Sequence, residues 1–78
     1  MTLDSFIELY KDLPIMGKID KLIETLDIKG SDRVSWLNAT RNRNEEEAEY
    51  WNREIKAMDA RIEWLYAEIS KGLDGGAL

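Results

Sequence analysis

The stretch VSWLNATRNRNEEEAEYWNREIKAMDARIEWLYAEI, residues 34–69, decides the fold. Positions spaced alternately by three and four residues along it are apolar, with Arg41 and Asn44 as the polar exceptions. This spacing keeps one face of an α-helix apolar over about five heptads, as in a coiled-coil seam. It predicts one long helix over residues 32–71 that self-associates through its seam. The seam residues are Ala48, Trp51, Ile55, Met58, Ile62, Leu65 and Ile69.

The same stretch contains a rival helix start. Asn44 precedes Glu45, Glu46 and Glu47, which combines a capping side chain with acidic residues in a first turn. A break in the long helix near residues 41–44 therefore stays open as an alternative. The unbroken heptad register favours continuity.

The N-terminal segment, residues 2–28, also has helical spacing, interrupted at Pro14. It is either one kinked helix or a short helix followed by a longer one, and it begins at Thr2 or at a capping box that starts at Ser5. Gly30, followed by residues suited to an N-cap, indicates a tight turn over residues 28–32.

These elements predict an all-α helical hairpin, with a kinked N-terminal helix and one long C-terminal helix. A 40-residue helix would be about 60 Å long, whereas the N-terminal segment would reach only about 40 Å. The excess length leaves part of the seam uncovered, so we expect the hairpins to assemble into an antiparallel helical bundle, a dimer or a tetramer. Residues 1–71 form the single expected domain, and residues 72–78 form a flexible tail.

A second apolar edge of the long helix lies off the seam. Its aromatic residues supply contact area and its alanines allow another helix to approach closely. We expect this edge either to be covered within the assembly, as we favour for Trp64, or to contact a different protein, as we favour for Trp36 beside the arginines. The candidate partner face comprises Trp36, Arg41, Arg43, Tyr50, Ala57, Ala60, Trp64 and Ala67.

Composition excludes several classes of function. The 78-residue chain has no cysteine and no histidine, and its formal net charge is −5. It therefore lacks the commonest general base and the commonest metal ligands. An acidic chain repels nucleic acid and anionic lipid, and no apolar run is long enough to span a membrane. The sequence predicts a cytoplasmic protein.

The carboxylates of the long helix form half of a known metal motif. Glu45, Glu46 and Glu49 follow the Glu-Glu-x-x-Glu pattern that all-helical nucleotide pyrophosphohydrolases use to hold Mg²⁺. The second half of that motif, Glu-x-x-Asp, would need a glutamate three residues before Asp59, where Lys56 stands. We therefore expect no metal, no cofactor and no enzymatic activity, and interpret the glutamates as a solvated helix face.

These observations favour a small acidic module that self-associates and acts by binding and occluding another protein of basic character. An inhibitor or antirepressor of a DNA-binding regulator, of the kind found in phages and mobile elements, is similar in size and charge alone. A purely structural assembly subunit is the alternative. A DNA-binding regulator that uses residues 33–43 is less well supported, because its basic patch is short.

Overall fold

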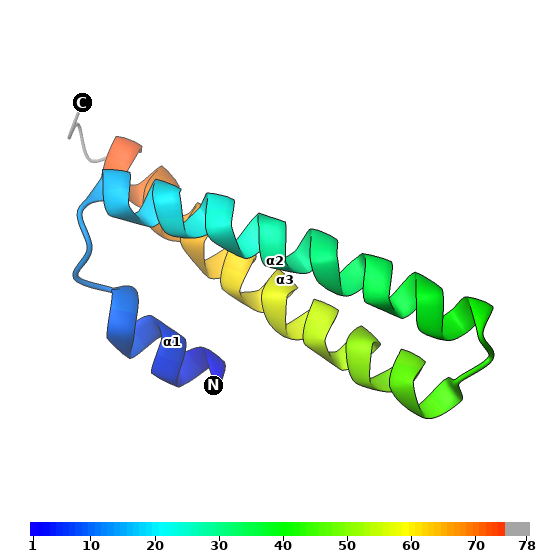
Figure 1. The fold of residues 1–78 in the computed structure, drawn as a ribbon. Helices are drawn as coiled ribbons and strands as arrows, with labels where there is room; N and C mark the ends of the chain where they lie inside the picture. Colours follow the sequence, from blue (N-terminus) through cyan, green and yellow to red (C-terminus); the bar gives the residue numbers. More distant parts are fainter. Residues whose placement is uncertain (75–78) are drawn as a thin grey trace.

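The computed structural model describes residues 1–74, which form three helices and no strand. Helix α1 spans Leu3–Tyr10, α2 spans Ile15–Arg41 and α3 spans Glu45–Asp74. Helices α2 and α3 form an antiparallel hairpin, and α1 lies beside the C-terminal half of α3 (Figure 1). The shape is elongated, with extents of 50 × 20 × 15 Å. The all-helical hairpin predicted from the sequence is confirmed.

The N-terminal segment is two helices rather than one kinked helix. The Thr2 hydroxyl caps α1 by accepting a hydrogen bond from the Ser5 backbone N–H at 3.2 Å, so the earlier of the two expected starts is correct. Pro14 then begins α2 as its N-cap, with an extended backbone (φ −63°, ψ 164°) and no side-chain cap. A proline suits this position, since the first turn of a helix needs no N–H from it.

The turn expected at residues 28–32 is wrong, because α2 runs without interruption through Gly30. A glycine inside a helix costs only about 1 kcal/mol, and packing along the rest of the helix offsets it. A Cβ placed on Gly30 would meet no atom within 4 Å, so the glycine faces open space. It therefore marks neither a turn nor a tight contact.

The chain reverses at residues 42–44, and the single long helix over 32–71 is therefore wrong too. Arg43 adopts a left-handed conformation (φ 57°), its N–H donates to the Thr40 carbonyl at 3.1 Å, and the Asn44 N–H donates to the Ala39 carbonyl at 2.9 Å. These two bonds are the Schellman motif that ends many helices. Asn44 then caps α3, because its side-chain oxygen accepts from the Glu47 N–H at 3.2 Å.

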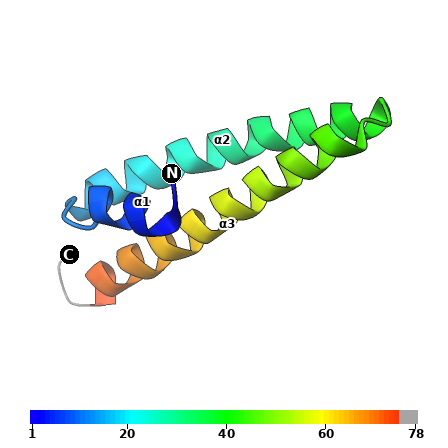
Figure 2. The same cartoon turned by 90° about the horizontal axis from the view of Figure 1, so that it is seen from below.

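The two long helices are nearly equal in length, about 40 Å and 45 Å. They lie side by side along their whole length (Figure 2). Ion pairs join Lys18 to Glu68 near one end and Lys29 to Asp59 near the middle. Because α2 covers α3 throughout, the length mismatch that suggested an uncovered seam does not exist.

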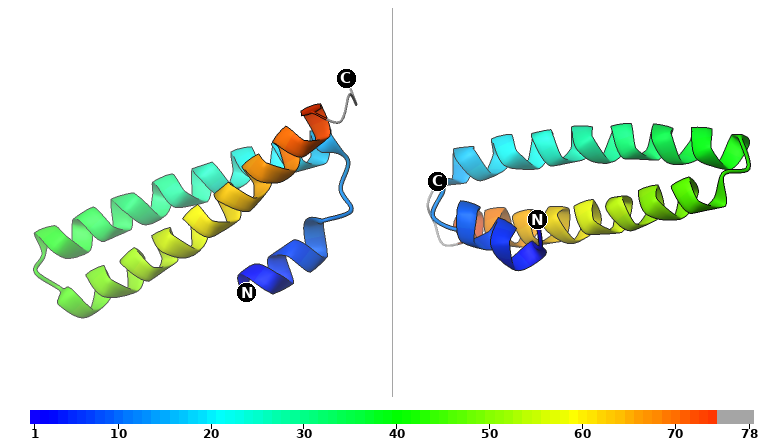
Figure 3. Two further views of the ribbon diagram at one scale, coloured as in Figure 1. Left: turned by 180° about the vertical axis from the view of Figure 1, so that it is seen from behind. Right: turned by 60° about the horizontal axis from the view of Figure 1, so that its bottom comes forward.

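The apolar core lies at the end of the hairpin away from the loop. It consists of Phe6 from α1, Leu22 from α2, and Ile62 and Leu65 from α3. Phe6 is the one buried side chain of α1, and it stacks edge-on against Trp64 with ring centroids 6.0 Å apart. Figure 3 shows α1 held against the half of α3 that carries these residues.

The C-terminal end of the last helix also differs from the expected boundary at residue 71. Helix α3 continues to Asp74, so residues 72–74 belong to the helix and not to the expected tail. The remainder of that expected tail, residues 75–78, lies outside the described residues.

Candidate interaction surface

The solvent side of α2 carries an apolar stripe between its charged residues. Six residues share this stripe at steps of three and four positions, with one step of eight, and we refer to them as the α2 stripe. Five of the side chains are between 42% and 65% exposed, and the sixth, Ile19, is half-buried. The residues of the α2 stripe are Met16, Ile19, Ile23, Leu26, Val34 and Leu37. Contiguous exposed apolar surface of this kind is characteristic of a contact site.

The opposite side of α2, which packs on α3, is mixed in character. Leu22 and Ala39 are buried there beside Thr25 and Asp32, and Lys18 and Lys29 reach acidic partners on α3. The buried Thr25 hydroxyl donates a hydrogen bond to the Lys21 backbone carbonyl at 2.7 Å, within its own helix. Helix α2 thus buries polar groups against α3 while several of its aliphatic side chains face solvent, unlike an ordinary surface helix. A partner on the outer side would account for these exposed aliphatic side chains.

Sequence reasoning missed the α2 stripe because of the turn wrongly placed at residues 28–32. That turn places Ile19, Ile23 and Leu26 in an N-terminal helix, and Val34 and Leu37 at the start of the apolar spacing of a long C-terminal helix. Joined in one helix, these residues follow steps of three and four positions, with one step of eight, on the same side. A search for apolar spacing that continued across Gly30 would have found them.

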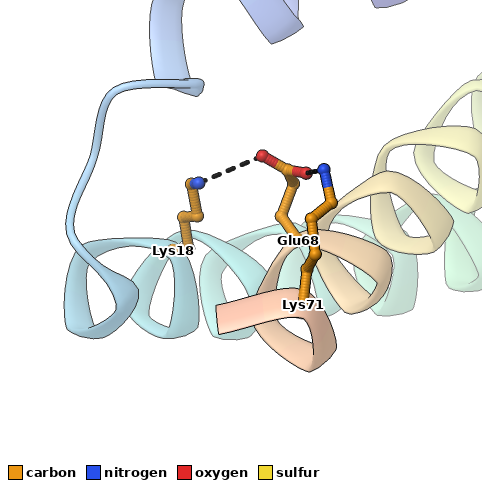
Figure 4. Close-up of polar contacts among 3 residues, drawn as sticks. All are labelled: Lys18, Glu68 and Lys71. Carbon is orange, nitrogen blue, oxygen red and sulfur yellow. Dashed lines mark hydrogen bonds and ion pairs between the residues drawn. The ribbon is translucent and has the colours of Figure 1, made fainter. Parts of the chain in front are cut away.

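The lysines near the start of α2 are turned away from the α2 stripe. The Lys18 and Lys71 ammonium groups both lie 3.1 Å from oxygens of the Glu68 carboxylate (Figure 4). Hydrogen bonds from Lys71 and Lys18 lower the pKa of Glu68 below its ordinary value. Lys21 pairs with Glu24 at 2.8 Å and sits over the Tyr10 ring, and the hydrogen bond to Glu24 is the main cause of its raised pKa.

The middle of the hairpin interface contains a buried carboxylate and a buried indole N–H. Asp32 is 9% exposed, and burial, followed by the nearby charge of Glu54, raises its pKa. The indole N–H of Trp51 is buried without a hydrogen-bond partner. Both groups cost free energy at the interface: Asp32 because its charge is buried, and Trp51 because its N–H is buried without a partner.

The seam predicted for self-association lies on the inner side of α3 within one chain. Met58, Ile62 and Leu65 are buried, and the other four seam residues are half-buried. Packing against α2 and α1 accounts for this burial, so the seam no longer requires a second copy. Self-association through it stays a prediction.

The predicted partner face does not form one surface. Trp64 is half-buried and packs edge-on against Phe6 of α1. Trp36 is half-buried on α2. Tyr50 and Ala67 are exposed, and Tyr50 stacks edge-on against Trp51 at 5.0 Å. Ala57 and Ala60 are half-buried on α3.

The two arginines of that predicted face lie at the hairpin tip and are exposed. Arg43 lines an open hollow of about 290 Å³ together with Thr40, Asn44, Glu45 and Ala48. Within residues 1–74, no group of three or more histidine, cysteine, aspartate or glutamate side chains is placed to hold a metal ion. No helix in the described part of the chain is both long and apolar enough to cross a bilayer.

Comparison with protein-family models, with curated proteins and with solved structures finds no match for this chain.

Proposed function

We propose that this chain is a helical protein-binding module and that the α2 stripe is its binding element. One observation carries the proposal: five large aliphatic side chains on one side of α2 are 42–65% exposed, and no described part of the chain covers them. Apolar side chains are costly in water and contribute binding free energy when a partner removes them from it. A module of this type acts by occupying a surface and needs no chemistry of its own.

The net charge supports a partner of basic character. The chain has 16 acidic and 11 basic side chains, and Glu45, Glu46 and Glu49 project from the start of α3 as exposed residues. Complementary charge speeds association and selects among partners. Occlusion of a DNA-binding regulator, as an inhibitor or antirepressor does, is the finer proposal. Its support is charge and size alone.

A purely structural role is the second candidate, and the same α2 stripe favours it. In that case copies of this chain would be the sole occupants of the stripe, and no other protein would bind. The two functions differ in what lies on the stripe in the cell, which can be tested directly.

Site-specific photo-crosslinking tests the proposal. The photoreactive residue p-benzoylphenylalanine replaces Leu37, which is 50% exposed on the α2 stripe. The matched control carries it at Tyr66, which is 53% exposed on α3. On irradiation of cells that express the chain, we expect discrete protein adducts at position 37 and only background at position 66. Equal, diffuse labelling at both positions would refute the proposal.

The mass of the adduct separates the two candidates. Adducts of twice the chain mass alone would favour the structural role. Adducts of other masses, identified by mass spectrometry, would name the partner. A heparin column tests the DNA-binding alternative, which predicts strong, salt-sensitive retention.

A further inference from the structure

Four of the six residues of the α2 stripe are placed symmetrically about Gly30. Leu26 and Val34 lie four residues to either side of this glycine, and Ile23 and Leu37 lie seven residues to either side. If a second α2 ran antiparallel with its Gly30 opposite the first, each of these residues would meet an aliphatic residue of the other copy. Such self-complementarity is the property that a two-fold symmetric interface requires.

The surroundings of Gly30 allow two helices to approach closely there. Apart from the backbone of its own helix turn, no atom lies within 4 Å of the point where a Cβ would stand, so the backbone is uncovered on its outer side. Glycine costs helix stability relative to alanine, and a close helix–helix contact at the symmetry axis would offset that cost.

Exposed charges on α2 follow the same symmetry. In the half before Gly30 the exposed charged residues are Asp20, Glu24 and Asp27, and in the half after it they are Arg33 and Arg41. The first half is therefore acidic on its solvent side and the second half basic. Antiparallel pairing brings the acidic half of each copy beside the basic half of the other, whereas parallel pairing brings like charges together.

One specific ion pair follows from this geometry. Asp20 and Arg41 are 21 residues apart, which is three heptads, so they lie within about 60° of each other around α2 and on the same side of Gly30's direction. A two-fold axis brings corresponding sides of the two α2 helices to the same side of the dimer. Asp20 stands ten residues before Gly30 and Arg41 eleven after it, so Asp20 of one copy meets Arg41 of the other. Within the described residues, neither side chain has an ion-pair partner in its own chain.

We propose that a second copy of this chain occupies the α2 stripe, with the two α2 helices antiparallel and their symmetry axis at Gly30. The inference rests on one part of the proposed function, that the α2 stripe is a binding element. With a second copy as the occupant of the stripe, any different protein would bind to another surface of the dimer, and the stripe itself would serve the structural role. It commits to a dimer in which α2 packs on α2 and each α3 lies on the outside. Binding of a helix from a different protein would not require apolar residues placed symmetrically about Gly30.

The first experiment measures mass by sedimentation equilibrium at micromolar concentration. We expect twice the chain mass of 9.1 kDa. Leu37→Lys should yield a monomer with unchanged helicity, because position 37 is exposed within one chain. The control Tyr66→Lys, equally exposed on α3, should remain a dimer.

The second experiment tests the register with charge reversals. Asp20→Arg and Arg41→Asp should each raise the dissociation constant about tenfold or more, because each homodimer then contains two like-charge contacts. An equimolar mixture of the two variants should dimerise as tightly as the original chain, since both contacts are then attractive. Within one chain the two residues are about 30 Å apart along the helix, so the restoration cannot be intramolecular.

A monomeric parent chain, or a mixture that associates no better than the single variants, would overturn the inference. The results that would refute the second copy differ from those that would refute the proposed function. If the purified chain is monomeric while position 37 still forms an adduct with a different protein, the second copy is wrong and the binding module stands. If position 37 forms no adduct and the chain is monomeric, both are wrong.

Discussion

Replacement of Arg43 by glycine should stabilise the protein, although arginine-to-glycine changes in helical proteins usually destabilise. Arg43 is the residue after the C-cap of α2 and has a φ of 57°. Side chains with a Cβ disfavour this left-handed conformation, whereas glycine adopts it freely. The Schellman hydrogen bonds use backbone atoms alone, so they survive the substitution.

The expected gain is small but measurable. Relief of the left-handed strain contributes about 1–2 kcal/mol, and the greater freedom of glycine in the unfolded chain takes back roughly 0.5–1 kcal/mol. The net gain is about 0.5–1 kcal/mol, which corresponds to a rise in Tm of roughly 2–8 °C for a chain of this size. If residues 42–44 instead continued one long helix, the same glycine would cost about 0.8 kcal/mol. The sign of the effect therefore distinguishes the hairpin from the continuous helix.

Thermal unfolding followed by circular dichroism measures this effect. All variants are compared at one protein concentration, because association makes Tm depend on concentration. Asn42→Gly is the control: its φ of −84° is ordinary for any residue, so glycine there relieves nothing and should lower Tm. If Arg43→Gly lowers Tm as much as Asn42→Gly does, the turn is not where the structure places it.

Two further substitutions test the interior. Asp32→Asn should stabilise the protein by about 1 kcal/mol at pH 7, because the buried carboxylate is ionised there at a cost. Because the folded-state pKa of Asp32 is raised, the cost of its buried charge is present above that pKa and disappears as the pH falls through it. Urea unfolding should therefore show a smaller difference in unfolding free energy between Asp32→Asn and the original chain near pH 4 than at pH 7. Trp64→Ala should cost about 2–3 kcal/mol, since its ring packs on Phe6 but is only half-buried. Tyr50→Ala, at an exposed position, should cost under about 1 kcal/mol in the same urea titration, and equal losses at the two positions would contradict the placement of α1.

The helical content and the hairpin could be predicted from the sequence, because they depend on local spacing. The position of the turn could not. Gly30 has the stronger local signal for a helix end, whereas the true end is occupied by Arg43, a residue rarely left-handed. What decides between them is the match in length between α2 and α3, which is a property of the whole hairpin. The local signal for the true turn is Asn44, whose side chain caps the start of α3.

The candidate surface was hidden for the same reason. The seam that was found, centred on Met58 and Ile62, is the inner side of α3, and its regular spacing reports burial within the chain. Spacing shows that a helix has an apolar side but not what covers that side. For α2 the two sides could be told apart only once Thr25 and Asp32 were seen to face inwards.

The short helix α1 makes the molecule two cooperative units instead of one. Its eight residues are too few to remain helical in water alone, so α1 is folded only while Phe6 and Tyr10 pack on the core and Arg61 donates to the Met1 carbonyl. Release of these few contacts frees the segment up to Pro14 and uncovers Trp64, at a cost below that of opening the hairpin. The α2 stripe lies on another side of the molecule and is untouched by this local unfolding. The chain can therefore present a second, aromatic surface from a minor population while its aliphatic surface stays in place.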